Sequence, residues 1–68
     1  MCYLERIVEI RQKRKLSQYD MAEKLKILQP QYQRYEKGKN EIPLRYFIEI
    51  CKILNVSSDY ILGLKDEE

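Results

Sequence analysis

The chain has 68 residues and a formal net charge of +2, and its length predicts one small domain (1–68). Because 44% of the residues are hydrophobic and 35% are charged, the composition is not that of a disordered tail. No apolar run approaches the roughly 20 residues of a membrane-crossing helix, and two cysteines without any histidine fall short of the roughly four ligands of a usual zinc site. We therefore expect a cytoplasmic protein with no membrane association and no metal, cofactor or small-molecule ligand. We also expect that it is not an enzyme, because the sequence offers no histidine base and no glycine-rich phosphate loop.

The first two predicted elements are helices, because apolar residues recur at intervals of three and four and no stretch alternates like a strand. The first runs over about 4–15, with Arg11 leaning toward its buried side and a basic cluster at 13–15, where cations suit the helix dipole. Ser17 begins the second, because Ser17 and Asp20 resemble a capping box and a stripe of apolar residues at 21, 22 and 25 follows.

A third, polar helix is predicted over about 29–36. Pro30 is compatible only with its first turn, where the missing N–H costs nothing. Tyr32 and Tyr35 lie three residues apart and share its inner face, Ile27 in the preceding turn is the inward anchor, and Gly38 suits a left-handed cap after its end.

The remaining elements are a long apolar helix and a short final one. Pro43 opens the fourth helix, whose apolar stripe is Leu44, Phe47, Ile48, Cys51 and Leu54. Ser57 caps the fifth helix and Gly63 ends it. The sequence therefore predicts an all-α fold in which Cys51 is a core residue, and it gives Cys2 no role.

Charge is distributed unevenly along the chain. Residues 1–45 hold 11 Lys and Arg against 6 Asp and Glu, or +5, whereas residues 46–68 hold 2 against 5, or −3. This asymmetry favours an anionic partner on one side of the molecule, although a merely solvated surface would carry charge as well.

Four segments, in this order and spacing, resemble the Xre/Cro type of phage-repressor helix-turn-helix domain: 16–18 (LSQ), 21–25 (MAEKL), 34–39 (RYEKGK) and 50–63 (ICKILNVSSDYILG). The resemblance implies a compact five-helix, lambda-repressor-like domain whose helices 2 and 3 form the motif, at about 17–36. It also implies a DNA-binding transcriptional regulator, a repressor rather than an activator, that occupies an operator with its third helix in the major groove.

The resemblance also assigns candidate contact residues by matched position. Glutamine suits adenine and arginine suits guanine at base edges, and the implied base contacts are Gln29, Pro30, Gln31 and Arg34. Gln18 is the phosphate contact that the resemblance implies. Lys37 and Lys39 flank the turn after the third helix and are expected to contact the phosphate backbone, with Arg14 and Arg45 as weaker candidates. These residues could instead be ordinary exposed polar side chains of a surface helix.

Arg11 and Glu36 match a partly buried ion pair of the family, which would join the first helix to the end of the third. Relatives commonly bind palindromic operators as symmetric homodimers, for which the candidate interface is Tyr60, Ile61 and Leu64, although these residues could simply close the monomer core. The protein would then be associated with the nucleoid.

Two positions depart from the family pattern. Lys26 replaces a glycine, so either lysine adopts a strained left-handed backbone there or the turn differs. Leu28 replaces a Ser or Thr cap, a loss that Pro30 and burial of the leucine could offset. The alternative function is a protein-interaction module on the same scaffold without DNA binding, against which the positive charge of residues 1–45 argues.

Overall fold

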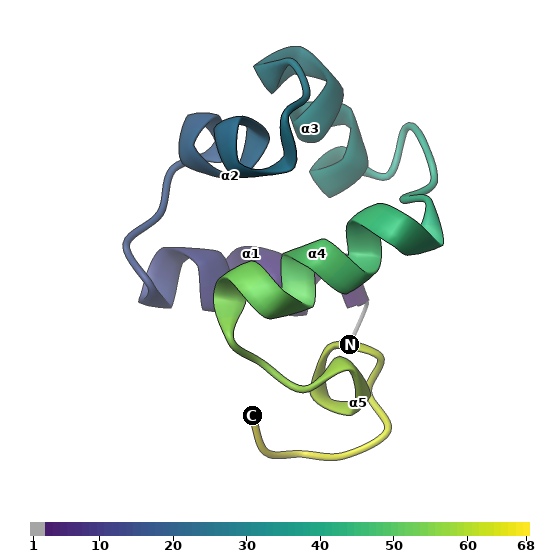
Figure 1. Ribbon diagram of the computed structural model, residues 1–68. Helices are drawn as coiled ribbons and strands as arrows, with labels where there is room; N and C mark the ends of the chain where they lie inside the picture. Colours follow the sequence, from purple (N-terminus) through teal and green to yellow (C-terminus); the bar gives the residue numbers. More distant parts are fainter. Residues whose placement is uncertain (1–2) are drawn as a thin grey trace.

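The computed structural model describes residues 3–68, and within that range it contains five helices and no strand (Figure 1). The helices are α1 (Tyr3–Lys13), α2 (Gln18–Leu25), α3 (Gln29–Lys37), α4 (Leu44–Leu54) and α5 (Ser58–Ile61). The predicted all-α, five-helix fold is therefore confirmed. None of the helices in the described range is long and apolar enough to cross a membrane, and Cys2 lies outside the described residues.

The end of α1 is the largest difference from the predicted boundaries. The helix stops at Lys13 instead of Lys15 because Lys15 adopts a left-handed backbone with φ of 60°. The Leu16 N–H then donates to the Arg11 carbonyl oxygen at 3.1 Å. Such a bond satisfies a carbonyl that the helix would otherwise leave without a partner.

The start of α2 is held by the predicted capping box. The Ser17 hydroxyl accepts from the Asp20 N–H at 3.0 Å, and the Asp20 carboxylate accepts from the Ser17 N–H at 2.8 Å. The hydrogen bond from the Ser17 N–H favours the charged carboxylate and, together with the Ser17 side chain, lowers the pKa of Asp20 below its usual value.

The core receives side chains from every helix. Figure 1 shows α2 and α3 together at one end of the molecule, α1 and α4 across its middle, and α5 at the other end. The largest fully buried side chains are Ile7, Ile10, Met21, Tyr32, Ile50, Leu54 and Ile61. The apolar stripe of α4 is less buried than the sequence predicts: the side chains of Leu44 and Ile48 remain 72% and 45% exposed.

Helix α5 is attached to α1 through Tyr60. The Arg6 guanidinium lies 4.3 Å from the centre of the Tyr60 ring and donates to the Tyr60 carbonyl oxygen at 2.7 Å. The Tyr60 hydroxyl donates to Glu9 at 2.6 Å, and Ile61 is fully buried. Tyr60 and Ile61 therefore close the monomer core, the second of the two roles considered for them, and of the proposed interface residues only Leu64 is exposed, at 72%.

Candidate nucleic-acid interface

The turn between α2 and α3 keeps the tight geometry that the family pattern implies. Lys26 has φ of 60° and ψ of 42°, and its N–H points to the carbonyl oxygens of Ala22 and Glu23. The Ile27 N–H donates to the Ala22 carbonyl oxygen at 3.0 Å. Of the two possibilities for this position, the structure therefore has the strained left-handed lysine instead of a different turn.

Leu28 precedes α3 without capping it. Its backbone is extended, with φ of −77° and ψ of 145°, and its side chain makes no capping hydrogen bond. The expectation that Leu28 is buried is wrong, because its side chain is 75% exposed. Ile27, which packs against the core, supplies the inward contact of this turn and leaves Leu28 on the outside.

Helix α3 is oriented by its two tyrosines. Tyr32 and Tyr35 are 0% and 5% exposed, and the Tyr35 ring centre lies 6.1 Å from that of Tyr46 in α4. Gly38 ends the helix with φ of 76°, as predicted. With its tyrosines facing inward, α3 turns its other side chains outward: Pro30 and Arg34 are exposed, and Gln29, Gln31 and Gln33 are half-buried.

A buried ion pair joins α1 to the C-terminal turn of α3. Arg11 Nε lies 2.7 Å from Glu36 Oε2, and the two side chains are only 11% and 5% exposed. The remaining Arg11 donors reach Glu36 Oε1 at 3.3 Å and the Leu16 carbonyl oxygen at 2.9 Å. The Tyr32 hydroxyl also donates to Glu36, at 2.5 Å, and burial together with this carboxylate raises the pKa of Tyr32.

Hydrogen bonds connect the glutamines to this buried pair. Gln18 Nε2 donates to Glu36 Oε1 at 2.9 Å, and Gln29 Nε2 donates to Gln18 Oε1 at 3.1 Å. Gln31 Nε2 donates separately to the Tyr35 hydroxyl at 2.9 Å. Sequence analysis missed the link from Gln18 to Gln29 because its members come from different helices, so no spacing within one helix reveals it.

The lysines at the end of α3 and just beyond it are exposed and not neutralised. Lys37 and Lys39 are exposed, as is Arg34, and within residues 3–68 none of the three takes part in a salt bridge. Arg45 is exposed at the start of α4, with its guanidinium 4.9 Å from the centre of the Tyr46 ring.

Arg14 is held elsewhere, at the C-terminal end of α4. Its Nε donates to the Leu54 carbonyl oxygen at 2.8 Å, and its Nη2 lies 2.9 Å from Glu68. Lys13 pairs with the same carboxylate, and both cations lower the pKa of Glu68. Because these partners occupy its guanidinium, we do not propose Arg14 as a phosphate contact. The same contacts keep the acidic tail at the end of the molecule away from α3 (Figure 1).

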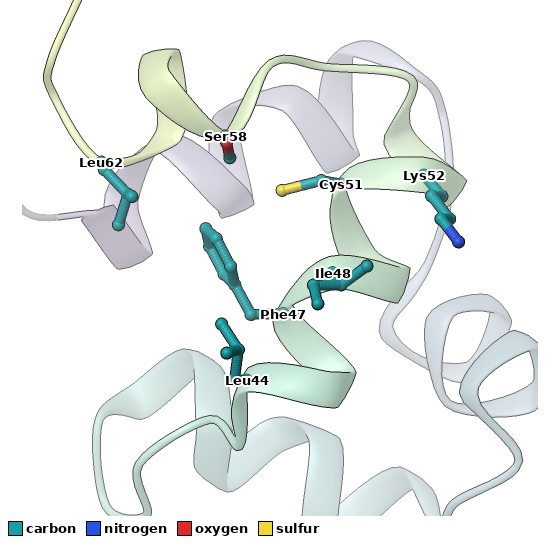
Figure 2. Close-up of a pocket in the computed structure, with 7 residues that line it drawn as sticks. All are labelled: Leu44, Phe47, Ile48, Cys51, Lys52, Ser58 and Leu62. Atoms are coloured by element: carbon teal, nitrogen blue, oxygen red, sulfur yellow. The ribbon is translucent and has the colours of Figure 1, made fainter.

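A different surface carries an apolar groove between α4 and α5. The groove has a volume of about 380 Å³ and is lined by Leu44, Phe47, Ile48, Cys51, Lys52, Ser58 and Leu62. The Phe47 side chain extends from α4 toward α5 (Figure 2), and Leu62 remains 49% exposed. Burial raises the pKa of the Cys51 thiol above its usual value. Across the described residues, no three His, Cys, Asp or Glu side chains gather as metal ligands would.

Known proteins resemble this chain over most of its length. A family model described as helix-turn-helix matches residues 7–61. A Bacillus subtilis (strain 168) protein described as the uncharacterized HTH-type transcriptional regulator YqaE is 42% identical over 66 residues, which are 97% of this chain and 57% of that protein. Another from the same organism, the uncharacterized HTH-type transcriptional regulator YobD, is 35% identical over 65 residues, 96% of this chain and 58% of that protein. The chain thus spans less than two thirds of either relative. No solved structure matches it significantly.

Proposed function

This chain belongs to the Xre/Cro-type helix-turn-helix family, and from that premise we propose that it is a sequence-specific regulator of transcription that binds double-stranded DNA. Helix α3 enters the major groove, where Gln29, Gln31 and Arg34 read base edges and Pro30 offers an apolar surface. An α-helix with its side chains is about 10–12 Å across, which suits a groove about 12 Å wide.

The observation that carries this proposal is the charge around α3. Glu36 is the only acidic residue between positions 29 and 39, and it is buried against Arg11. The exposed charges that remain there, on Arg34, Lys37 and Lys39, are all positive. Lys37 ends α3 and Lys39 lies just beyond it, so both are suited to hold phosphate, with Gln18 and Arg45 as further contacts.

Repression by occupation of an operator is the mode of action that fits best, because it requires a binding surface and no effector site. A palindromic operator bound by a homodimer places its half-sites about 34–36 Å apart. The longest dimension of the chain is 31 Å, so two copies side by side reach successive turns of DNA. Leu64 and the apolar groove are the surfaces available for that contact, and such a regulator works at the nucleoid in the cytoplasm.

Titration against random duplex DNA at two salt concentrations tests the proposal. If about four phosphates are contacted, affinity falls roughly a hundredfold between 50 and 200 mM salt, because bound counterions are released. An absent or salt-independent affinity contradicts the proposal.

The second candidate is a protein-interaction module on the same scaffold. The apolar groove of α4 and α5 favours it, since exposed apolar surfaces commonly mark contacts with other proteins. This candidate predicts that the charge of α3 is dispensable, so Lys37→Ala and Lys39→Ala leave its binding unchanged. A regulator that reads DNA through α3 loses affinity with both substitutions.

A further inference from the structure

The basic cluster at 13–15 is a feature that the proposed function leaves unexplained. Lys13, Arg14 and Lys15 form the only run of three consecutive cations in the sequence, and they lie at and just beyond the C-terminal end of α1. Clustered cations attract DNA phosphates whatever the base sequence. Left free, this cluster would offer DNA a second binding surface that reads no bases.

Two of the three cations are paired with the carboxylate of Glu68. Arg14 Nη2 lies 2.9 Å from Glu68 Oε1, and Lys13 pairs with Glu68 Oε2, so one carboxylate meets both cations, each through a different oxygen. Hydrogen bonds from Lys13 and Arg14 lower the pKa of Glu68 below its usual value. The carboxyl group is therefore charged at neutral pH.

Arg14 is also held in place by the end of α4. Its Nε donates to the Leu54 carbonyl oxygen at 2.8 Å, and its Nη2 donates to the Asn55 carbonyl oxygen at 3.4 Å. These bonds satisfy carbonyl groups that the end of a helix leaves without partners. Glu68 thus approaches a cation whose position α4 has already determined.

The backbone of the tail is held as well. The main-chain oxygen of Glu68 accepts from the Ser57 N–H at 3.3 Å, and the Lys65 carbonyl oxygen accepts from Arg6 Nη1 at 3.1 Å. Exposed ion pairs are usually weak, partly because two long side chains must be ordered to form them. Because the backbone of Glu68 and the guanidinium of Arg14 are already positioned, this contact needs less ordering than most.

The two acidic residues before Glu68 provide a comparison. Asp66 and Glu67 are exposed, and in the part of the chain that the structure describes neither takes part in a salt bridge. They carry the same charge as Glu68 but do not reach the basic cluster. Glu68 therefore differs from them in its contacts and not in its charge.

We propose that Glu68 raises the sequence specificity of DNA binding by neutralising Lys13 and Arg14, which leaves α3 and its flanking lysines as the favoured surface for DNA. Figure 1 shows the C-terminal end of the chain at the opposite end of the molecule from α3, so the contact does not touch DNA that α3 binds. Random DNA can meet the protein in any orientation, and it is this DNA that Glu68 excludes. The inference rests on the proposed function, since it concerns the specificity of the same binding.

Affinities for two duplexes test the inference: a random-sequence duplex, and a duplex that the wild type selects from a randomised pool. Glu68→Gln keeps the length of the side chain and removes its charge. We expect its affinity for the random duplex to rise roughly threefold to tenfold at about 50 mM salt, with a salt slope steeper by about one unit, because a further phosphate is contacted. Affinity for the selected duplex should stay within about twofold of the wild type, so the ratio of the two affinities falls.

Glu67→Gln is the matched control, because it makes the same change in net charge at the neighbouring residue. An exposed charge without a partner is screened by salt, so this variant should raise affinity for the random duplex by less than about twofold. An increase as large as that of Glu68→Gln would show that net charge, and not the Glu68 contact, is responsible.

Lys13→Gln, made in two backgrounds, tests whether Lys13 is one of the cations that Glu68 neutralises. In the wild type it should leave affinity for the random duplex unchanged, because Lys13 is already neutralised there. In the Glu68→Gln chain it should remove a large part of the gain. Both chains of this second comparison carry the same substitution at position 68, so any loss of stability that it causes cancels. Equal effects in the two backgrounds would overturn the inference.

Failure of the inference is distinguishable from failure of the proposed function. A wild-type chain that selects no duplex from the pool overturns both. A wild type that selects a defined duplex, while Glu68→Gln leaves the ratio of the two affinities as it was, overturns only the inference.

Discussion

At the scale of single residues, Glu36 has more polar partners than any other side chain of α3. It accepts four hydrogen bonds, two from Arg11 of α1, one from Gln18 of α2 and one from Tyr32 of its own helix. Its side chain is only 5% exposed. Removal of Glu36 therefore leaves several donors, one of them charged, without a partner in the interior.

We predict that Glu36→Leu destabilises the fold by about 3–5 kcal/mol, because it leaves the Arg11 guanidinium buried and uncompensated. The double variant Arg11→Met, Glu36→Leu should cost markedly less, since an apolar pair of similar volume carries no desolvation penalty. Urea denaturation of the wild type, both single variants and the double variant measures the coupling free energy. The geometry indicates that the two side chains are coupled, and additive effects of the two substitutions would contradict this.

Gln31 and Lys39 should contribute to DNA binding in different ways. Gln31→Ala is expected to relax preference at one base pair by about 1–3 kcal/mol, because a base-edge contact is lost. Lys39→Ala should weaken binding to every sequence alike and reduce the salt slope by about one unit, because a phosphate contact is lost. Binding isotherms on matched and single-base-changed duplexes compare the two. A uniform loss with both variants would refute this division between base and phosphate contacts.

At the scale of elements, three helix ends use a left-handed residue other than glycine. Lys15, Lys26 and Asn55 have φ of 60°, 60° and 52°, whereas Gly38 ends α3 with φ of 76°. A left-handed backbone costs an L-residue with a Cβ about 1–2 kcal/mol, and asparagine tolerates it better than lysine does. The two lysines therefore mark positions where the fold stores strain.

Lys26→Gly should stabilise the chain by about 0.5–1 kcal/mol, the relief of strain less the greater freedom of glycine in the unfolded state. For a domain of this size that gain corresponds to a rise in Tm of roughly 2–8 °C. Lys24→Gly is the matched control: it lies two residues earlier, exposed and within α2, so it should destabilise by about 0.5–1 kcal/mol. Thermal unfolding of both variants checks the opposite signs, and a loss of stability with Lys26→Gly would contradict the strain argument.

Local features of the elements were predictable from the sequence, whereas of the contacts between elements only the Arg11–Glu36 pair was expected, and that from the family resemblance. The capping box of Ser17, the left-handed cap at Gly38 and the buried faces of the α3 tyrosines each depend on residues within one or two turns. Arg14 instead meets a carbonyl 40 residues away, and Gln18 reaches Glu36 across 18 residues. Such contacts depend on how helices pack, which hydrophobic spacing alone does not specify. The exposure of Leu44 has the same origin, because a helical stripe shows which face is apolar and not how much of it a small domain covers.

At the scale of the whole molecule, charge is segregated between two ends. The acidic tail neutralises Lys13 and Arg14 through Glu68, whereas Arg34, Lys37 and Lys39 remain free of salt bridges among residues 3–68. The positive field is thus concentrated beside α3, where it can steer an anionic partner toward the helix that we propose reads DNA. The net charge of +2 conceals this separation.

Stability of the whole molecule should be flat across neutral pH and fall at both extremes. The chain contains no histidine, the side chain that usually titrates between pH 5 and 8. On the acid side, the hydrogen bond from the Ser17 N–H, together with the Ser17 side chain, lowers the folded-state pKa of Asp20 below 3.8. The stability that this carboxylate contributes is present above that value and is lost as pH falls through the folded-state pKa.

On the alkaline side the sign is reversed, and Tyr32 is the group that tests it. Burial of the Tyr32 hydroxyl and its hydrogen bond to the Glu36 carboxylate raise the pKa of Tyr32 well above its unfolded value of 10.0. Its stabilising contribution is complete below pH 10 and is lost progressively as pH rises toward the folded-state pKa, because only the unfolded chain then releases the proton. Urea denaturation at pH 7, 10 and 11 should show this decline in the wild type and a smaller one in Tyr32→Phe. Tyr19→Phe, at a position 64% exposed, should decline as the wild type does. Equal declines in all three chains would show that Tyr32 is not the group responsible.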